Sequence, residues 1–385
     1  MELTAPAVFD LGLVLLLAAV AGRVARIAGL PAVVGYLIVG LAISPFTPGY
    51  VADRHQLAFL ADVGVVLLLF EVGIEIDLRR IWRDHGPIAW LAPAQVAFTT
   101  GAALAVLVAL GVQPLGAAFV ALGIAMSSSV VIVNITRSRR RTTDAATERA
   151  LLGWSVIQDV VGVSIAVVLL AVADIGQRPV LAALAGAGIF VLAILAAAWV
   201  LPRVLRRLEG EDLMLIVSVG VGLALAGFGA IVAGVPIALA AFTAGLVVAE
   251  GPESIEVRRR LLPFRDLFAV LFFVLLGSLI DPGALGRGVG WLGTILVLLV
   301  VGKSVVAALL ARVGGLRADA PQLGVGLGQV GEFSFVLASA ALALDLIGEE
   351  LYAAVLGSVV ASIAASTILV RRIGGRALEE EAAPA

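Results

Sequence analysis

The feature that most constrains this chain is a succession of apolar runs, separated by short clusters of glycine, proline and charged residues. Each run is about 20 residues long, which matches the hydrocarbon thickness of a bilayer. Hydrophobic residues make up 61% of the chain and charged residues 14%, whereas a soluble domain carries about a quarter charged residues. The sequence therefore predicts an all-α polytopic membrane protein whose main solvent is lipid.

We expect about thirteen membrane-spanning helices. Their approximate positions are 7–27, 31–46, 55–77, 86–110, 114–136, 147–173, 179–205, 211–231, 234–250, 262–281, 287–311, 320–345 and 348–370.

The arginines are distributed unequally between the ends of these expected helices. Only Arg54, Arg178 and Arg287 follow even-numbered helices, and the other arginines follow odd-numbered ones. Cytoplasmic loops are enriched in arginine and lysine, so we expect a multi-pass protein of the bacterial inner membrane with its N-terminus outside and its C-terminus in the cytoplasm. The transmembrane domain is expected over 1–375, with a short cytoplasmic tail at 376–385.

Several classes of site are excluded by composition. The chain has no cysteine, which rules out disulfides, iron–sulfur clusters and thiol-ligated zinc. The histidines, His55 and His85, are not grouped with patterned carboxylates, so no metal site is expected beyond a transported ion. The first apolar run carries Glu2 and Asp10 instead of a basic region, and it is typical of a transmembrane helix rather than a signal peptide.

Two pairs of segments indicate an internal repeat. Residues 29–46 (GLPAVVGYLIVGLAISPF) resemble 234–251 (GVPIALAAFTAGLVVAEG), and 67–77 (LLLFEVGIEID) resemble 271–281 (LFFVLLGSLID), with an offset of 204 or 205 in both cases. This offset corresponds to seven helices, an odd number, so the copies have inverted topology, which is typical of transporters. The alternative is that apolar helices resemble one another by chance.

The repeat divides the transmembrane domain into three parts. Repeat one is expected near 7–173, a linker helix near 179–205, and repeat two near 211–370.

Two segments have the composition of discontinuous helices. Residues 123–133 contain the consecutive serines Ser127, Ser128 and Ser129, and residues 324–336 contain four glycines within eight residues. Glycine weakens a helix by about 1 kcal/mol relative to alanine. The repeat offset aligns the two segments, so we expect two crossed broken helices whose exposed backbone groups suit ions. The alternative is that these small residues only permit close helix packing.

Asp159 is the most informative charge, because it lies near the middle of an apolar run and follows Gln158. A carboxylate at that depth costs about 2.5–3.5 kcal/mol. Lipid and protein disfavour its ionised form, so a proton can compete with a cation for it. This is the minimum requirement for antiport. The alternative is a structural carboxylate paired with a cationic side chain.

Lys303 and Glu332 are two further buried charges. Lys303 is the only lysine and lies mid-span, so it must pair or lose its proton. It either pairs with Asp159 or compensates helix ends at the crossing, and the sequence leaves both roles open. Glu332, in the second break, is expected to act electrostatically in the core, with cation binding or pairing to Arg265 as alternatives.

Other charges receive simpler interpretations. Arg265 and Asp266 lie near a cytoplasmic helix end and form either part of an inner funnel or a local ion pair. Glu71 is also deep in its helix. The basic run at 137–141 is interpreted as a topology anchor for anionic lipid, and no nucleic-acid partner is expected.

These residues resemble the membrane domain of Kef-type monovalent cation/proton antiporters, in the cation/proton antiporter 2 family. The resemblance covers nearly the whole chain, and its most specific motifs are VIQDV (156–160) and GQVGEF (328–333). Weaker matches are the segments at 29–45, 67–78, 127–133 and 261–277. The resemblance implies a sodium/proton antiporter-like fold with a dimer domain, a mobile core domain and an elevator-like motion.

The resemblance also implies roles for individual residues. Asp159 matches the ion- and proton-binding aspartate, while Lys303 and Glu332 match family positions. Gln158 stands where some relatives carry a second aspartate or an asparagine, which favours electroneutral exchange unless Lys303 supplies a second titrating group. Ser127–Ser129 complete the expected ion site.

One departure concerns regulation. Kef proteins usually continue into a cytoplasmic nucleotide-binding domain, whereas this sequence stops at residue 385. The chain is therefore ungated, or has a separate cytoplasmic regulatory subunit, or is a part of a longer protein.

We interpret the chain as a secondary transporter, with no cofactor, that exchanges K⁺ or Na⁺ for H⁺ by alternating access. Its expected partners are membrane lipid and, from the resemblance, a second copy in a homodimer. A channel-like or uncoupled pathway and a sodium-coupled symporter of related fold are the alternatives. No Gly-x-Ser-x-Gly motif, metal cluster or pair of catalytic aspartates supports an enzyme.

Overall fold

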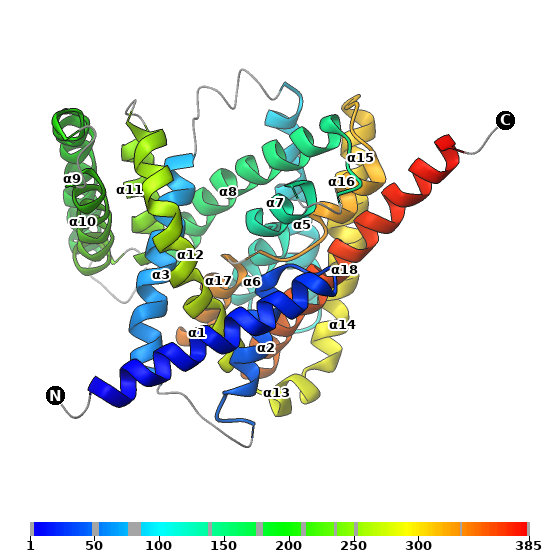
Figure 1. The fold of residues 1–385 in the computed structure, drawn as a ribbon, viewed down its shortest axis with the longest axis horizontal. Coiled ribbons are helices and arrows are strands. Elements are labelled where there is room, and N and C mark those ends of the chain that lie inside the picture. Colours follow the sequence, from blue (N-terminus) through cyan, green and yellow to red (C-terminus); the bar gives the residue numbers. More distant parts are fainter. Residues whose placement is uncertain are drawn as a thin grey trace. The chain divides into compact units, whose positions relative to one another are not determined.

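The computed structural model describes residues 4–47, 54–75, 86–137, 141–174, 180–208, 213–234, 237–249, 253–331 and 333–382, and all regular structure in these ranges is helical (Figure 1). The elements are α1 (Thr4–Ile27), α2 (Ala32–Ala42), α3 (Arg54–Glu75), α5 (Ile88–Ala109), α6 (Pro114–Ala125), α7 (Ser129–Arg137), α8 (Ala145–Asp174), α9 (Val180–Arg207), α10 (Leu213–Phe228), the π-helical η1 (Gly229–Ala233), α11 (Ile237–Ala249), α12 (Ser254–Ser278), α13 (Pro282–Arg287), α14 (Val289–Val297), the π-helical η2 (Leu298–Val305), α15 (Val306–Val313), α16 (Ala320–Leu327), α17 (Phe333–Ala343) and α18 (Glu349–Ala382).

Within these ranges, eight helices are long and apolar enough to cross a membrane, judged by length and composition. Several carry large apolar side chains on their outer surface, such as Trp90 and Phe98 on α5 and Leu192 on α9. In water such a surface would be unfavourable, but in lipid it is the expected one. The predicted all-α membrane fold is confirmed, while the number of thirteen crossings stays a prediction.

The chain divides into two compact units. The first comprises residues 1–17, 51–80 and 167–275. Inside this unit α3 packs closely on α11, because Gly73 and Gly245 face each other: a Cβ atom on either glycine would lie closer than 3.0 Å to backbone of the other helix. Small residues permit such approach in membrane proteins, where dispersion forces rather than water exclusion hold helices together.

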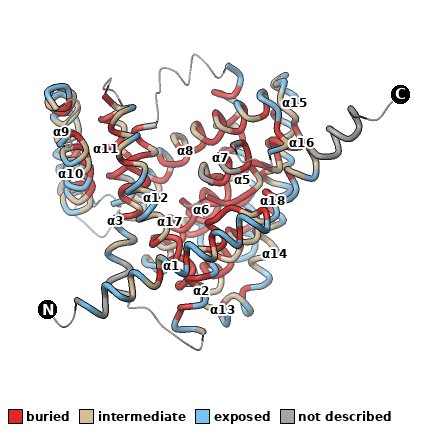
Figure 2. Tube along the Cα trace, viewed as in Figure 1, coloured by how far each residue is buried: buried red, intermediate tan, exposed pale blue. Residues whose placement is uncertain are grey.

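The second unit comprises residues 18–50, 81–166 and 276–385. It contains the two broken segments, α6/α7 and α16/α17, which lie in the spans expected at 114–136 and 320–345 and confirm the breaks predicted within 123–133 and 324–336. In Figure 1, α6 (cyan) and α17 (orange) lie together although they are far apart in sequence, and the two helices are in contact. Figure 2 shows that α6 is buried along most of its length, which makes it a central element of this unit.

The two units contain equivalent glycine contacts at positions related by the repeat offset. In the first unit a Cβ atom on Gly73 would collide with the carbonyl of Phe242, and in the second a Cβ atom on Gly277 would collide with the carbonyl of Leu37. Gly277 follows Gly73 by 204 residues and Phe242 follows Leu37 by 205. The sequence match thus coincides with a repeated three-dimensional contact, which chance similarity between apolar helices would not produce.

Helix ends repeat in the same way. Gly111 after α5 and Gly315 after α15 are also 204 residues apart and have φ angles of 91° and 64°. In both, the amide of the next residue donates to a carbonyl in the last helical turn at 3.0 Å. This is a Schellman ending, which requires a left-handed residue and therefore favours glycine.

We expect Gly245→Ala to destabilise the protein by about 1–3 kcal/mol, because the new methyl group would overpack the α3–α11 contact. The measurement is thermal unfolding of the detergent-purified protein. Gly220→Ala on α10 is the matched control, because nothing lies within 4 Å of its Cβ position. Equal unfolding temperatures for the two variants would contradict the packing argument.

Candidate functional site

Two broken helices cross in the second unit, and backbone contacts hold them together. Helix α6 ends at Ala125, residues 126–128 are not helical, and α7 begins at Ser129, while α16 ends at Leu327 and α17 begins at Phe333. The amide of Gly331 donates to the carbonyl of Met126 at 3.1 Å. The hydroxyl of Ser127 donates to the carbonyl of Leu327 at 2.8 Å. The crossing therefore satisfies backbone groups that each break leaves without a helical partner.

The side chain of Gln329 reinforces the crossing. Its Oε1 accepts from the amide of Ser128 at 3.0 Å, and its Nε2 donates to the carbonyl of Ser128 at 3.2 Å. The side-chain amide of Gln329 thus satisfies both the backbone N–H and the backbone C=O of Ser128, as a neighbouring β-strand would. A Cβ atom on Gly331 would lie 2.8 Å from the carbonyl carbon of Ser127, so only glycine fits at the crossing point.

Lys303 lies between the two breaks and is 0% exposed. Its Nζ donates to the carbonyl of Met126 at 2.8 Å and to that of Gln329 at 2.7 Å, one from each break. The carbonyl ends of α6 and α16 both carry partial negative charge, which the lysine side chain offsets. These contacts fit the second of the two roles that the sequence left open, and which role Lys303 has stays a prediction. An electrostatic interaction with Asp159 is also present.

The helix around Lys303 is locally unwound. Residues Leu298–Val305 form the π-helical segment η2, where the hydroxyl of Ser304 donates to the carbonyl of Leu299 at 3.0 Å. Gly324 of α16 packs against Ser304, and a Cβ atom there would come closer than 3.0 Å to it. The π segment and the glycine-rich half-helix therefore fit together, consistent with the frequent occurrence of π-bulges at functional sites.

Asp159 and Gln158 lie on α8, beside the first break. Asp159 is 2% exposed and Gln158 is fully buried. Helix α8 approaches the break closely, because a Cβ atom on Gly162 would collide with the side chain of Met126. The Nε2 of Gln158 lies 3.5 Å from the carbonyl of Ala125, to which it donates. The predicted aspartate and amide therefore lie next to the carbonyl end of α6.

The predicted serines occupy the first break itself. Ser127 and Ser128 are buried, and Ser129 is partly buried at the start of α7. The hydroxyl of Ser128 accepts from the amide of Val131 at 3.4 Å and so caps α7. Glu332 lies outside the described residues, so its predicted role stays a prediction.

Sequence reasoning assigned no role to four polar residues of this region: Gln95, Thr99, Trp154 and Gln329, the last of which lies in the GQVGEF motif. All four are buried and hydrogen-bonded to residues of the crossing or to one another. Gln95 and Gln329 are amides within apolar segments, and an unpaired amide is costly there. That cost is the signal that could have indicated them.

A comparison with protein families shows which family the chain belongs to. Residues 12–373 match the family model described as "Sodium/hydrogen exchanger, transmembrane". The chain belongs to the sodium/hydrogen exchanger family.

A related protein and two solved structures extend this result. The chain is 32% identical over 375 residues to YbaL of Escherichia coli (strain K12), which is named as a candidate cation/proton antiporter. The match covers 92% of this chain and 66% of YbaL, so the chain spans a little less than two thirds of that relative.

The fold is similar to that of the sodium proton antiporter MjNhaP1 from Methanocaldococcus jannaschii. One structure of MjNhaP1, determined at pH 8, has a TM-score of 0.71 and 17% identity, and the match covers 97% of this chain and 99% of that one. A second, from an electron-microscopy map, has a TM-score of 0.65 and 13% identity, with 97% of both chains covered. The chain therefore has the sodium/proton antiporter fold with two crossed discontinuous helices, as predicted.

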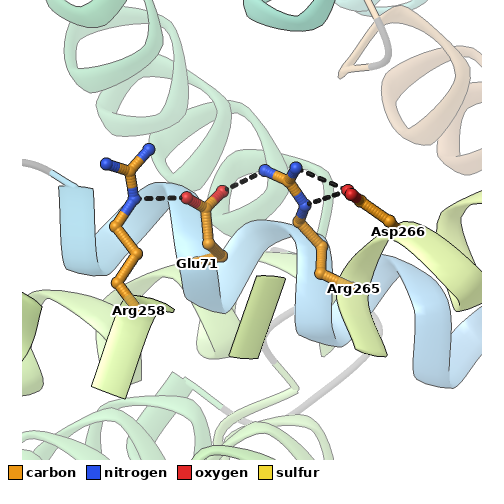
Figure 3. A network of polar contacts seen from close by, with 4 residues as sticks. All are labelled: Glu71, Arg258, Arg265 and Asp266. Atoms are coloured by element: carbon orange, nitrogen blue, oxygen red, sulfur yellow. Dashed lines mark hydrogen bonds and ion pairs between the residues drawn. The ribbon is translucent and has the colours of Figure 1, made fainter. Parts of the chain in front are cut away.

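A separate charge network lies in the first unit of the chain (Figure 3). Glu71 of α3 is 1% exposed and accepts from Arg258 Nε at 2.6 Å and from Arg265 Nη1 at 2.7 Å. Arg265 also pairs with the exposed Asp266 at 2.6 Å. Of the two interpretations offered for Arg265 and Asp266, the structure shows the local ion pair, with Glu71 as a further partner.

We expect Glu71→Gln to be strongly destabilising, by about 3–5 kcal/mol, because it removes the carboxylate that two guanidinium groups share. Thermal unfolding of the purified protein measures this effect. Asp266→Asn is the matched control, since its side chain is 68% exposed and surface pairs contribute about 0–1 kcal/mol. A Glu71→Gln variant as stable as Asp266→Asn would show that the network does not stabilise the first unit.

Proposed function

We propose that this chain exchanges a monovalent cation, K⁺ or Na⁺, for protons across the membrane by alternating access. The observation that carries the proposal is the position of Asp159, a buried carboxylate beside two crossed broken helices in a protein of the sodium/hydrogen exchanger family. A cation and a proton neutralise the same carboxylate, so binding of one excludes the other. This competition couples the two fluxes.

The proposed cation site consists of oxygen atoms, the ligands that alkali cations prefer. Asp159 supplies the charge, and Gln158 Oε1 and the Ser127–Ser129 segment supply neutral oxygens. The hydroxyl proton of Ser127 is used by the carbonyl of Leu327, so its oxygen lone pairs remain available. Lys303 and Glu332 are assigned electrostatic roles around this site.

We assign one-for-one exchange to this site. One carboxylate with a neutral amide neighbour gains one positive charge when it binds either a monovalent cation or a proton. The net charge of the site is then equal in both transport directions, and exchange is electroneutral.

The remaining parts of the proposal concern the cell. We propose a multi-pass protein of the bacterial inner membrane, with the N-terminus outside and the C-terminus in the cytoplasm, because arginines follow the odd-numbered expected helices. We also propose a homodimer and, where no regulatory domain follows this chain, a separate cytoplasmic regulatory subunit.

The decisive experiment is dye-reported proton exchange in everted membrane vesicles, with Na⁺ and K⁺ added separately. We expect one of the two cations to dissipate the proton gradient with the wild-type protein and to lose this effect in Asp159→Asn, because the neutral amide binds neither ion in exchange for the other. The matched control is Asp345→Asn. Asp345 is exposed and has a φ of 54°, a conformation that asparagine also tolerates.

Three outcomes would contradict the proposal. If neither cation acts on the wild type, the antiport assignment fails. An active Asp159→Asn variant would mean that the site is elsewhere. Cation movement without proton movement would indicate an uncoupled pathway, and uptake of both ions in the same direction would indicate symport.

A further inference from the structure

Three fully buried polar side chains are linked by hydrogen bonds: Trp154, Gln95 and Gln158, which precedes Asp159 on α8. A carboxamide has an acceptor on one side and donors on the other. The side of Gln158 that faces the ion site therefore decides whether it attracts or repels a cation. The surrounding hydrogen bonds determine which side this is.

The orientation of Gln95 is determined from two directions. The indole Nε1–H of Trp154 lies 3.3 Å from Gln95 Oε1, and an indole nitrogen only donates, so the atom that faces it must be oxygen. On the other side, the hydroxyl of Thr99 uses its single proton to donate to the carbonyl of Gly302 at 2.7 Å. Towards Gln95 it can only accept, and Gln95 Nε2 donates to it at 2.9 Å.

The orientation of Gln158 follows from that of Gln95. The Nε2 of Gln158 donates to Gln95 Oε1 and to the carbonyl of Ala125. Both of these atoms only accept, so Gln158 Oε1 must point the other way. In the part of the chain that the structure describes, this buried oxygen has no hydrogen-bond donor, as expected for an atom that is completed by a bound cation.

We propose that Trp154 is a positioning residue of the ion site. Its indole N–H fixes the carboxamide of Gln95, which in turn fixes Gln158 with its oxygen, rather than its NH₂ group, presented to the cation beside Asp159. Thr99 holds the same orientation from the opposite side. The inference rests on the proposed function of the site and specifies how a neutral amide is made a cation ligand.

The opposite orientation of the two amides, Gln95 and Gln158, shows why their orientation must be fixed by neighbouring residues. If both amides rotated by 180°, Gln95 would donate to Gln158 and the bond between them would be kept. The NH₂ group of Gln158 would then face the cation and repel it. The two arrangements are distinguished by the donor Trp154 and the acceptor Thr99 at the outer ends, and more weakly by the Ala125 carbonyl, which accepts from the Nε2 of Gln95 at 3.4 Å and of Gln158 at 3.5 Å.

The test is the cation dependence of transport by Trp154→Phe in the same vesicles. We expect the KM for the active cation to rise about fivefold, the effect of losing one hydrogen bond, with a maximal rate close to that of wild type. At a fixed, subsaturating cation concentration, we expect the pH of half-maximal transport to shift upwards. The reason is that a cation bound with lower affinity competes less well with protons for Asp159. Trp90→Phe on α5 is the matched control, because Trp90 is 71% exposed.

Thr99 provides an independent second test should Trp154→Phe fail to fold. We expect Thr99→Val to raise the KM and Thr99→Ser, which restores the hydroxyl, to reverse most of that increase. The double variant Trp154→Phe/Thr99→Val should raise the KM by more than the product of the two single effects, because either residue alone still favours one orientation.

The failure of this inference is distinguishable from failure of antiport. Cation binding is also measured on purified protein, as the Na⁺ or K⁺ concentration that gives half of the cation-induced thermal stabilisation. Suppose that the wild type is active, that Asp159→Asn is inactive, and that the KM is unchanged in both Trp154→Phe and the double variant. This result would overturn the proposed role of Trp154 and leave the antiport proposal intact. A fall in maximal rate with an unchanged KM would assign these residues to structure instead.

Discussion

The crossing of the two broken helices depends on the side chain of Lys303. Two half-helices, α6 and α16, end at the crossing with carbonyl groups that have no helical partner. In a low-dielectric interior this concentration of partial negative charge would oppose their approach. Lys303 Nζ donates one hydrogen bond to each break, and its charge offsets the repulsion between the two carbonyl ends. The cost of burying the amine is in turn reduced by those carbonyls and by Asp159.

Close approach of backbone is the second constraint, and it acts throughout the molecule. Gly331 at the crossing, Gly324 on η2 and the Gly73–Gly245 pair leave no room for a Cβ atom. A protein in lipid gains little from burying apolar side chains between helices, so it relies on dispersion contacts and backbone hydrogen bonds at short range. The breaks at the site and the tight packing elsewhere therefore have the same compositional cause, and the sequence pattern of small residues alone does not separate them.

The buried charges of the two units are arranged differently. In the first unit Glu71 has ion pairs to two arginines on α12, which suits a fixed structural element. In the second, Lys303 donates to two backbone carbonyls and interacts electrostatically with Asp159, which follows the neutral amide Gln158 on α8. The proposed competition of cation and proton at Asp159 therefore takes place beside the buried charge of Lys303, whereas Glu71 is shared by two guanidinium groups.

The sequence by itself determined the membrane environment, the two broken helices, the repeat offset and the burial of Asp159 and Lys303. Each of these follows from hydropathy, from local glycine and serine content, from matching segments or from a charge that is costly in lipid. Only the tertiary structure decided which atoms these residues contact. Lys303 reaches two backbone carbonyls, which have no identity in the sequence, and Arg265 pairs with Glu71, which is 194 residues away. The orientation of Gln158 depends on donors and acceptors from several helices. Such directional contacts are set by packing in space, whereas hydropathy and periodicity record only the local cost of each residue.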